Sequence, residues 1–260
     1  WDFLKNTYAI DKEKYCFSTG IGKRDIANIE QLIKKYHPKF ICIDVANGYM
    51  SKFINTISYF RTNYPNLIII AGNVVSPEMV AIIADAGADI VKLGIGSGSV
   101  CTTRVKTGIG CPQLSAVLDC WETAQEHEIK IMSDGGIQIP GDVCKAYAAG
   151  ADFVMLGSML AGHRDTTKNV IYKNGGVFAE FYGMSSIEAN NKYSGGMGKY
   201  KAEEGKRVLI PLKGNVMDTV NDILGGVRSC CAYLGAQEIS EIYENSKIVK
   251  VQHQVNDQYL

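Results

Sequence analysis

A glycine-rich loop with a cysteine is the part of the sequence that could do chemistry most directly. It runs from Gly94 to Arg104 as GIGSGSVCTTR and follows an apolar run that ends at Leu93. The backbone N–H groups of such a loop can bind a phosphate, and its carbonyl oxygens can hold a monovalent cation. Cys101 is a candidate nucleophile, because N–H dipoles and the nearby Arg104 both favour a thiolate. A tight turn with an inert cysteine is the alternative that these residues leave open.

Two more glycine-bearing segments follow later apolar runs and could bind the same ligand. They are Gly135-Gly136, directly after Asp134, and Gly157-Ser158. Three such loops on one face are harder to obtain by chance than one, so together they predict a phosphate site. Asp134 and Asp44 each end a predicted strand, where a carboxylate can hold a ribose hydroxyl or orient a cofactor. Capping of a loop is the alternative for these aspartates.

Proton transfer at the thiol would need a further group, and the sequence offers Thr103 together with Glu204. A hydroxyl beside a carboxylate can relay a proton, provided that the segment carrying Glu204 closes over Cys101. A solvated glutamate within KAEEGK is the alternative. The four histidines show no spacing that is typical of metal ligands.

Six short apolar runs, separated by amphipathic helical patterns, must position these loops. The runs cover residues 15–19, 40–44, 67–71, 89–93, 129–134 and 152–156. Apolar strands that alternate with helices predict an α/β fold with a parallel sheet. Each run is followed by a loop that contains glycine, so all these loops would converge on one face. This convergence favours a (β/α)8 TIM barrel over a doubly wound sheet.

The position of the phosphate loops sets the expected domain organisation. In such barrels a phosphate commonly lies on the loops after strands seven and eight. If the loops at 134–136 and 157–158 form that site, the six runs are strands three to eight, and the first two strands are missing from the chain. We therefore expect one catalytic barrel domain over residues 1–260, N-terminally incomplete. A flap rich in glycine and tyrosine is expected at about 180–211.

Charge, hydropathy and cysteine content argue against several other classes of protein. Lys plus Arg and Asp plus Glu both total 27, so no global field favours nucleic acid or an anionic membrane. The apolar runs are far shorter than the roughly 20 residues that span a bilayer, and the first residues lack the apolar core of a signal peptide. Eight cysteines without a Cys-x-x-Cys pair predict free thiols. We therefore expect a cytoplasmic protein with no nucleic-acid or membrane partner.

Several motifs spread over nearly the whole chain resemble those of a known family. They include DVANGY, AGNVV, GSVCTTR, SDGG, AGADFVMLG, FYGMSS and VQHQVN. These motifs are similar to those of the GMP reductases, in the family that also contains the IMP dehydrogenases. The dehydrogenases carry a longer flap with an Arg-Tyr pair that activates water, whereas the interval between Gly183 and Glu204 is short and has no such pair. The resemblance implies a reductase, with IMP dehydrogenase and a non-catalytic purine-nucleotide-binding barrel as alternatives.

The resemblance also implies a reaction and a set of residue roles. The reaction is the reductive deamination of GMP to IMP and ammonia with NADPH, through a thioimidate on Cys101, while Thr103 and Glu204 help ammonia to leave. The implied substrate-binding positions are Ser99, Asp134, Gly135, Gly136, Gly157, Ser158, Tyr182, Gly183, Met184, Ser185, Lys201 and Gly205. The implied cofactor-binding positions are Asp44, Ala46, Asn47, Met184, Ser229, Cys230, Cys231 and Ala232. Carbonyls of Gly96, Gly98 and Cys101 match a potassium site, and relatives are usually homotetramers in which residues 229–232 contact the cofactor across a subunit boundary.

Overall fold

A single parallel sheet forms the body of the molecule. The computed structural model describes residues 10–251 except 168, 194–195, 197 and 199–201. Six strands are hydrogen-bonded in sequential order: β1 (Cys16–Thr19), β2 (Phe40–Asp44), β3 (Ile68–Val74), β4 (Ile90–Leu93), β5 (Lys130–Asp134) and β6 (Phe153–Met155). Neighbouring strands are parallel throughout. The six predicted strands and their parallel arrangement are confirmed.

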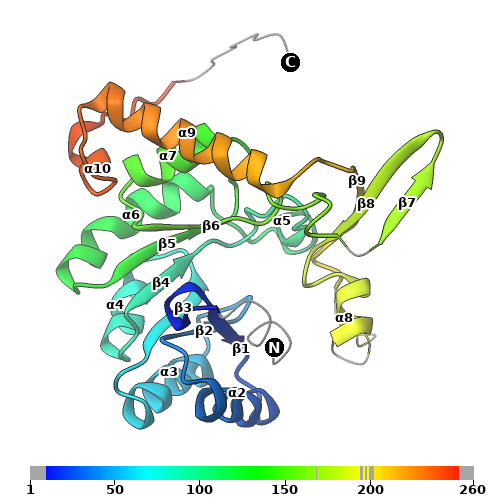
Figure 1. Cartoon of the computed structure of the whole chain (residues 1–260). Coiled ribbons are helices and arrows are strands. Elements are labelled where there is room, and N and C mark those ends of the chain that lie inside the picture. The colour runs from blue at the N-terminus through cyan, green and yellow to red at the C-terminus, as the bar shows by residue number, and fades with distance from the viewer. Residues whose placement is uncertain (1–9, 168, 194–195, 197, 199–201, 252–260) are drawn as a thin grey trace.

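Helices connect the successive strands and cover the outer side of the sheet. They are α2 (Lys23–Tyr36), α3 (Ser51–Asn63), α4 (Pro77–Asp85), α5 (Thr103–Thr107), α6 (Gln113–Glu126) and α7 (Pro140–Ala148), and a short 3-10 turn, η1 (Lys12–Lys14), precedes β1. Figure 1 shows the strands following one another along a curved sheet, with α2, α3, α4, α6 and α7 around its outside. This is the arrangement of consecutive strand and helix units in a (β/α)8 barrel, as the sequence predicts.

Each strand buries one face against the helices and turns its other face to the inside of the curve. The large core on the helical side includes the fully buried residues Ile41, Ile43, Phe53, Phe60 and Ile69. The inward-facing residues form a second, smaller cluster of Cys42, Ile70, Ile90 and Met132. In the central strands β2 to β5 both faces are mostly buried, so these strands read as near-continuous apolar runs rather than as an alternation of apolar and polar residues.

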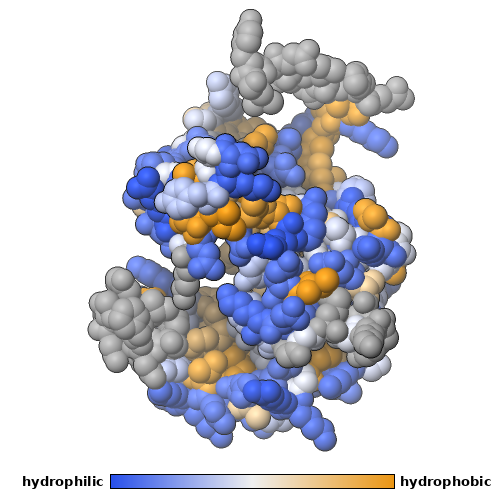
Figure 2. Space-filling model, turned by 90° about the vertical axis from the view of Figure 1, so that its right-hand side faces the viewer, coloured by the Kyte–Doolittle hydropathy of each residue, from blue (hydrophilic) through white to orange (hydrophobic). Residues whose placement is uncertain are grey.

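A second, antiparallel sheet follows β6, and the sequence did not predict it. Its strands are β7 (Val170–Lys173), β8 (Gly176–Tyr182) and β9 (Arg207–Pro211), in the order β7-β8-β9. Helix α8 (Ile187–Tyr193) lies between β8 and β9, so the expected flap comprises the end of β8, α8 and β9. Figure 1 shows this sheet projecting from the barrel units, and Figure 2 shows apolar patches among polar surface on that side.

Two C-terminal helices complete the outer layer. Helix α9 (Val216–Leu234) packs on α7 through Ile223 and Val227. Helix α10 (Glu241–Asn245) contributes Tyr243, whose ring stacks on Trp121 of α6 with 4.2 Å between the ring centroids. Among the described residues, no helix has the length and the apolar character needed to cross a membrane.

Candidate active site

Cys101 lies on the loop after β4, and this loop is held against the end of β5. The Ser97 hydroxyl donates a hydrogen bond to the Asp134 carbonyl at 3.0 Å. A Cβ at Gly94 would clash with the same carbonyl oxygen, so the loop can approach β5 this closely only with glycine there. The glycine-rich loop is therefore built into the strand-end face and is not an isolated turn.

The thiol, a hydroxyl and a carboxylate form a continuous chain of hydrogen bonds. The Cys101 thiol donates to the Thr103 hydroxyl, with 3.2 Å between Sγ and Oγ1. The Thr103 hydroxyl donates in turn to the Glu204 carboxylate at 2.7 Å. A proton can pass along this chain from the sulfur to the carboxylate, which would leave a nucleophilic thiolate.

Backbone contacts hold Glu204 beside the cysteine loop. The Thr102 N–H donates to the Glu204 carbonyl at 2.8 Å, and the Thr102 hydroxyl donates to the Glu203 carbonyl at 3.0 Å. Cys101 and the buried Gly205 form an isolated antiparallel bridge. The structure therefore brings together the three residues that the sequence predicted as a relay, although Glu204 is distant from the other two along the chain.

Arg104 takes a different place from the one that the sequence suggested. Its guanidinium donates to the Cys111 carbonyl, and its side chain packs against Gly96 and Gly110. The polar partner of the Cys101 thiol in this structure is therefore Thr103, and Arg104 stabilises the fold of the loop.

A cavity of about 140 Å³ lies beside the cysteine loop, at the ends of β5 and β6. All three glycine-bearing loops contribute to its wall, as expected for loops that share one ligand. The lining residues are Gly98, Ser99, Val100, Asp134, Gly135, Gly136, Ile137, Gln138, Met155, Gly157, Ser158 and Phe181. Glycine-rich backbone and two serine hydroxyls around a space of this size suit a phosphate group.

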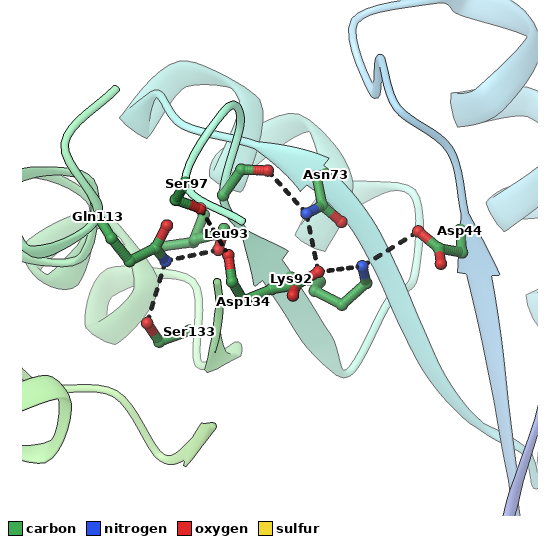
Figure 3. Close-up of polar contacts among 9 residues, drawn as sticks. Asp44, Asn73, Lys92, Leu93, Ser97, Gln113, Ser133 and Asp134 are labelled. Carbon is green, nitrogen blue, oxygen red and sulfur yellow. Dashed lines mark hydrogen bonds and ion pairs between the residues drawn. The ribbon is translucent and has the colours of Figure 1, made fainter. Parts of the chain in front are cut away.

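Lys92, on β4, joins the carboxylates of Asp44 and Asp134, as Figure 3 shows. Its Nζ lies 2.5 Å from Oδ2 of Asp134 and 3.0 Å from Oδ1 of Asp44, and the residue is only 3% exposed. Burial alone would lower the pKa of Lys92, but the two carboxylates outweigh it and raise the pKa above the usual 10.5. The lysine is therefore charged at neutral pH. The sequence reasoning did not single out Lys92, although a charged residue inside the apolar run DIVKL was the available signal.

The predicted substrate positions on the flap lie near the relay but are unevenly exposed. The Gly183 N–H donates to the Lys206 carbonyl at 3.3 Å, which ties the start of the flap to the segment after Glu204. Met184 and Ser185 are exposed. Tyr182 is the last residue of β8. The preceding residue, Phe181, lines the phosphate-sized cavity, whereas Tyr182 does not. Lys201 lies outside the described residues. The roles of all these positions stay predictions.

The positions implied for the cofactor are divided between two regions. Ala46 and Asn47 follow β2, next to Asp44, and both are exposed. Residues 229–232 lie near the C-terminal end of α9, on the outer helical layer. In Figure 1 this end of α9 lies far from α5, which begins at Thr103 within the cysteine loop. The role of residues 229–232 in cofactor binding stays a prediction.

The fold and the site together define a class of protein: an α/β barrel that carries, at its strand ends, a cysteine hydrogen-bonded through a hydroxyl to a carboxylate, and a phosphate-sized cavity. A family model described as the IMP dehydrogenase / GMP reductase domain matches residues 5–257. The chain belongs to this family.

Named relatives agree with this assignment. The chain is 47% identical to a GMP reductase of Photobacterium profundum, over 99% of this chain and 74% of that protein. It is 49% identical to GMP reductase 2 of Homo sapiens, over 94% of this chain and 70% of that protein. A crystal structure of a GMP reductase from Trypanosoma brucei in complex with guanosine 5′-monophosphate matches with a TM-score of 0.85 and 34% identity, over 90% of this chain. The chain spans 49% of the length of that structure.

Proposed function

We propose that this chain carries the active site of a GMP reductase, which converts GMP and NADPH to IMP, ammonia and NADP⁺ in purine nucleotide interconversion. The observation that carries the proposal is the chain of hydrogen bonds from Cys101 through Thr103 to Glu204. Family membership supports the choice of substrate, because relatives that cover nearly the whole of this chain are named GMP reductases.

In the first half-reaction Cys101 attacks C2 of guanine and ammonia leaves. The thiol proton passes through Thr103 to Glu204, and the freed thiolate forms the carbon–sulfur bond. The proton then returns from Glu204 through Thr103 to the amine as the carbon–nitrogen bond breaks. The product is a thioimidate on Cys101, and the thiol proton ends in the released ammonia, so atoms and charge balance.

The second half-reaction converts the thioimidate to IMP. NADPH, when bound, supplies the hydride that C2 receives. Expulsion of the sulfur then releases IMP, and a proton restores the thiol. Asp44, Ala46 and Asn47 are the residues of this chain that would hold the nicotinamide, and their exposure fits such a role, since the Asp44 side chain is 49% exposed beside Lys92.

The remaining parts of GMP have matching groups at the strand ends. Ser99, Gly136 and Ser158 line the phosphate-sized cavity, where serine hydroxyls and backbone N–H groups would donate to the phosphate. Asp134 lies at the edge of the same cavity, as expected for a carboxylate that accepts from ribose hydroxyls. Phosphate and ribose would thus be held in both half-reactions while the base changes.

Three finer features belong to the same proposal. A potassium ion would bind carbonyls of Gly96, Gly98 and Cys101; the Gly98 carbonyl accepts the Cys101 N–H at 3.0 Å and keeps a second lone pair for a cation. A cytoplasmic location and a homotetramer are part of the proposal, and apolar side chains exposed on the second sheet, such as Val170 and Val177, would pack in an interface between copies. Comparing rates with NADPH and NADH, and with potassium and sodium salts, tests the cofactor and the cation.

The deciding experiment incubates the full-length protein with GMP and NADPH and follows the loss of absorbance of the reduced cofactor. We expect absorbance loss that requires both compounds and is accompanied by equimolar ammonia. Formation of reduced cofactor from IMP and NAD⁺ with release of xanthosine monophosphate would instead indicate a dehydrogenase. Nucleotide binding without either reaction would indicate a binding barrel, and the proposal would be wrong.

A further inference from the structure

A buried lysine shared by two carboxylates is the strongest feature that the proposed reaction leaves unused. We propose that Lys92 is a positioning residue for the nucleotide, which neutralises Asp134 and fixes it so that the ribose meets a carboxylate oxygen in a defined orientation. The proposal rests on the proposed function, since it concerns the binding of GMP at Asp134. Lys92 acts through Asp134 and not on the reacting atoms.

Two donors converge on one oxygen of Asp134. Lys92 Nζ lies 2.5 Å from Oδ2, and the Asn73 amide donates to the same oxygen at 3.0 Å. Asn73 also donates to the Gly94 carbonyl at 2.7 Å, at the start of the cysteine loop. The other carboxylate oxygen, Oδ1, has no partner among the described residues and is available to a ribose hydroxyl (Figure 3). The carboxylate is therefore clamped on one side and open on the other.

Lys92 reaches Asp44 across an intervening strand because the residue between them is glycine. In the sheet register Asp44 of β2 pairs with Gly72 of β3, and Gly72 pairs with Lys92 of β4. A Cβ at Gly72 would lie 2.7 Å from the Cβ of Lys92, well inside van der Waals contact. The sequence thus leaves room on the inner face for one long cationic side chain that spans three strands.

The two ion pairs indicate that Lys92 has an electrostatic role in addition to packing on the inner face of the sheet. One ammonium faces two carboxylates, each within 3.0 Å, and it has almost no access to water. Leaving a buried charge unpaired here would cost several kcal/mol of stability, so the ion pairs of Lys92 with Asp134 and with Asp44 depend on one another. Without the ammonium, Asp134 would face Asp44 as a like charge and would lose its shortest hydrogen bond. The carboxylate would then turn or shift, and ribose hydroxyls would meet it in the wrong place.

The test measures GMP binding by calorimetry without cofactor, so that the proposed contact of Asp44 with the nicotinamide does not enter. Lys92→Met should weaken binding roughly ten- to a hundredfold, the range for losing a hydrogen bond to a charged group. Lys92→Arg keeps the charge and should recover most of the affinity. Lys130→Met is the matched control, because it removes a lysine that pairs with Asp152 at 2.9 Å at the opposite end of β5. This control should bind GMP like the wild type.

A double variant separates positioning by charge from general damage to the fold. Adding Asp44→Asn to Lys92→Met removes the like charge that faces Asp134, so part of the GMP affinity should return. Asp44→Asn alone should not tighten binding, since Lys92 already neutralises the pair. A merely structural role of Lys92 predicts instead that the second substitution adds to the loss.

The possible results separate failure of this inference from failure of the proposed function. Unchanged GMP affinity in Lys92→Met, or no recovery in the double variant, would overturn the role of Lys92 while the wild type still binds GMP. A wild-type protein that does not bind GMP would overturn the proposed function. If circular dichroism shows that Lys92→Met is unfolded, comparing the double variant with Asp44→Asn still isolates the lysine. Equal affinities in that comparison would overturn the proposal.

Discussion

Replacing Glu204 by glutamine separates the release of ammonia from the transfer of hydride. A glutamine oxygen can still accept from the Thr103 hydroxyl, which now bonds the Glu204 carboxylate at 2.7 Å. The backbone bond from Thr102 to the Glu204 carbonyl, at 2.8 Å, does not involve the side chain. The substitution therefore keeps the shape of the site and removes the group that takes up and returns the proton.

The size of the effect follows from the role of the relay. A positioned general acid or base contributes roughly 10²–10⁴-fold, which at 1.36 kcal/mol per factor of ten is about 2.7–5.4 kcal/mol of barrier. Ammonia release from GMP should slow by this factor, because the amine cannot leave unprotonated. The reverse hydride step from IMP and NADP⁺ should keep most of its rate, since no amine is involved and the thiol proton can leave to water. Cys101→Ala should abolish both steps, because no covalent intermediate can form.

A stopped-flow record of NADPH formation from IMP and NADP⁺ distinguishes these variants. We expect a burst in the wild type and in Glu204→Gln, and none in Cys101→Ala. Glu203→Gln is the matched control, because that neighbouring carboxylate accepts from the Ile187 N–H at 3.3 Å and not from Thr103. If Glu204→Gln loses the burst as completely as Cys101→Ala, water cannot replace Glu204 as the acceptor of the thiol proton, or Glu204 serves the hydride step, and the separation of ammonia release from hydride transfer is refuted.

Three further outcomes are expected. GMP and IMP should protect Cys101 from labelling by iodoacetamide, as measured by peptide mass spectrometry, and equal labelling of Cys101 with and without nucleotide would contradict the site. Cys120 should react slowly at any pH below its own pKa, because burial raises the pKa of that thiol to about 12. Ser99→Ala and Ser158→Ala should each weaken GMP binding by about 1.5–3 kcal/mol and spare kcat at saturation, and a collapse of kcat with unchanged KM would argue against phosphate binding. Hydrogen exchange across α8 should slow when GMP and NADPH are added, and unchanged exchange would contradict a closing flap.

The parallel sheet could be predicted because its signal is local. The strand predicted at 67–71 is an apolar run followed by Gly72, and the structure forms β3 over Ile68–Val74. The apolar signal is strongest in the central strands, because both faces of the sheet are mostly buried there. The contact between Glu204 and the cysteine loop was predicted only on the condition that the flap closes over Cys101. The sequence of either segment does not show how close the two segments lie in the folded chain.

The antiparallel sheet was missed although a local signal existed. Residues 170–182 read as two β-branched and aromatic runs around Asn174-Gly175. Both residues of this turn have positive φ, 50° for Asn174 and 75° for Gly175, as a tight hairpin turn requires. The flap predicted at about 180–211 left residues 170–179 unassigned, so this pattern was missed. A scan for Asn-Gly between strand-like runs would have found the hairpin.

The partnership of Lys92 with two aspartates depends on strand register, which no local pattern contains. Within the run DIVKL, the lysine could as well have faced the helices or the edge of a sheet. The strand register determines which face Lys92 occupies. It pairs Lys92 with Gly72 and places it on the same face of β4 as Ile90, two residues earlier, which packs in the inner cluster. A shift of β4 by one residue would turn Lys92 away from Asp134 and Ile90 out of that cluster together. Core packing and the clamped carboxylate are therefore specified by the same register, so a substitution that disturbs packing at Ile90 should also weaken nucleotide binding.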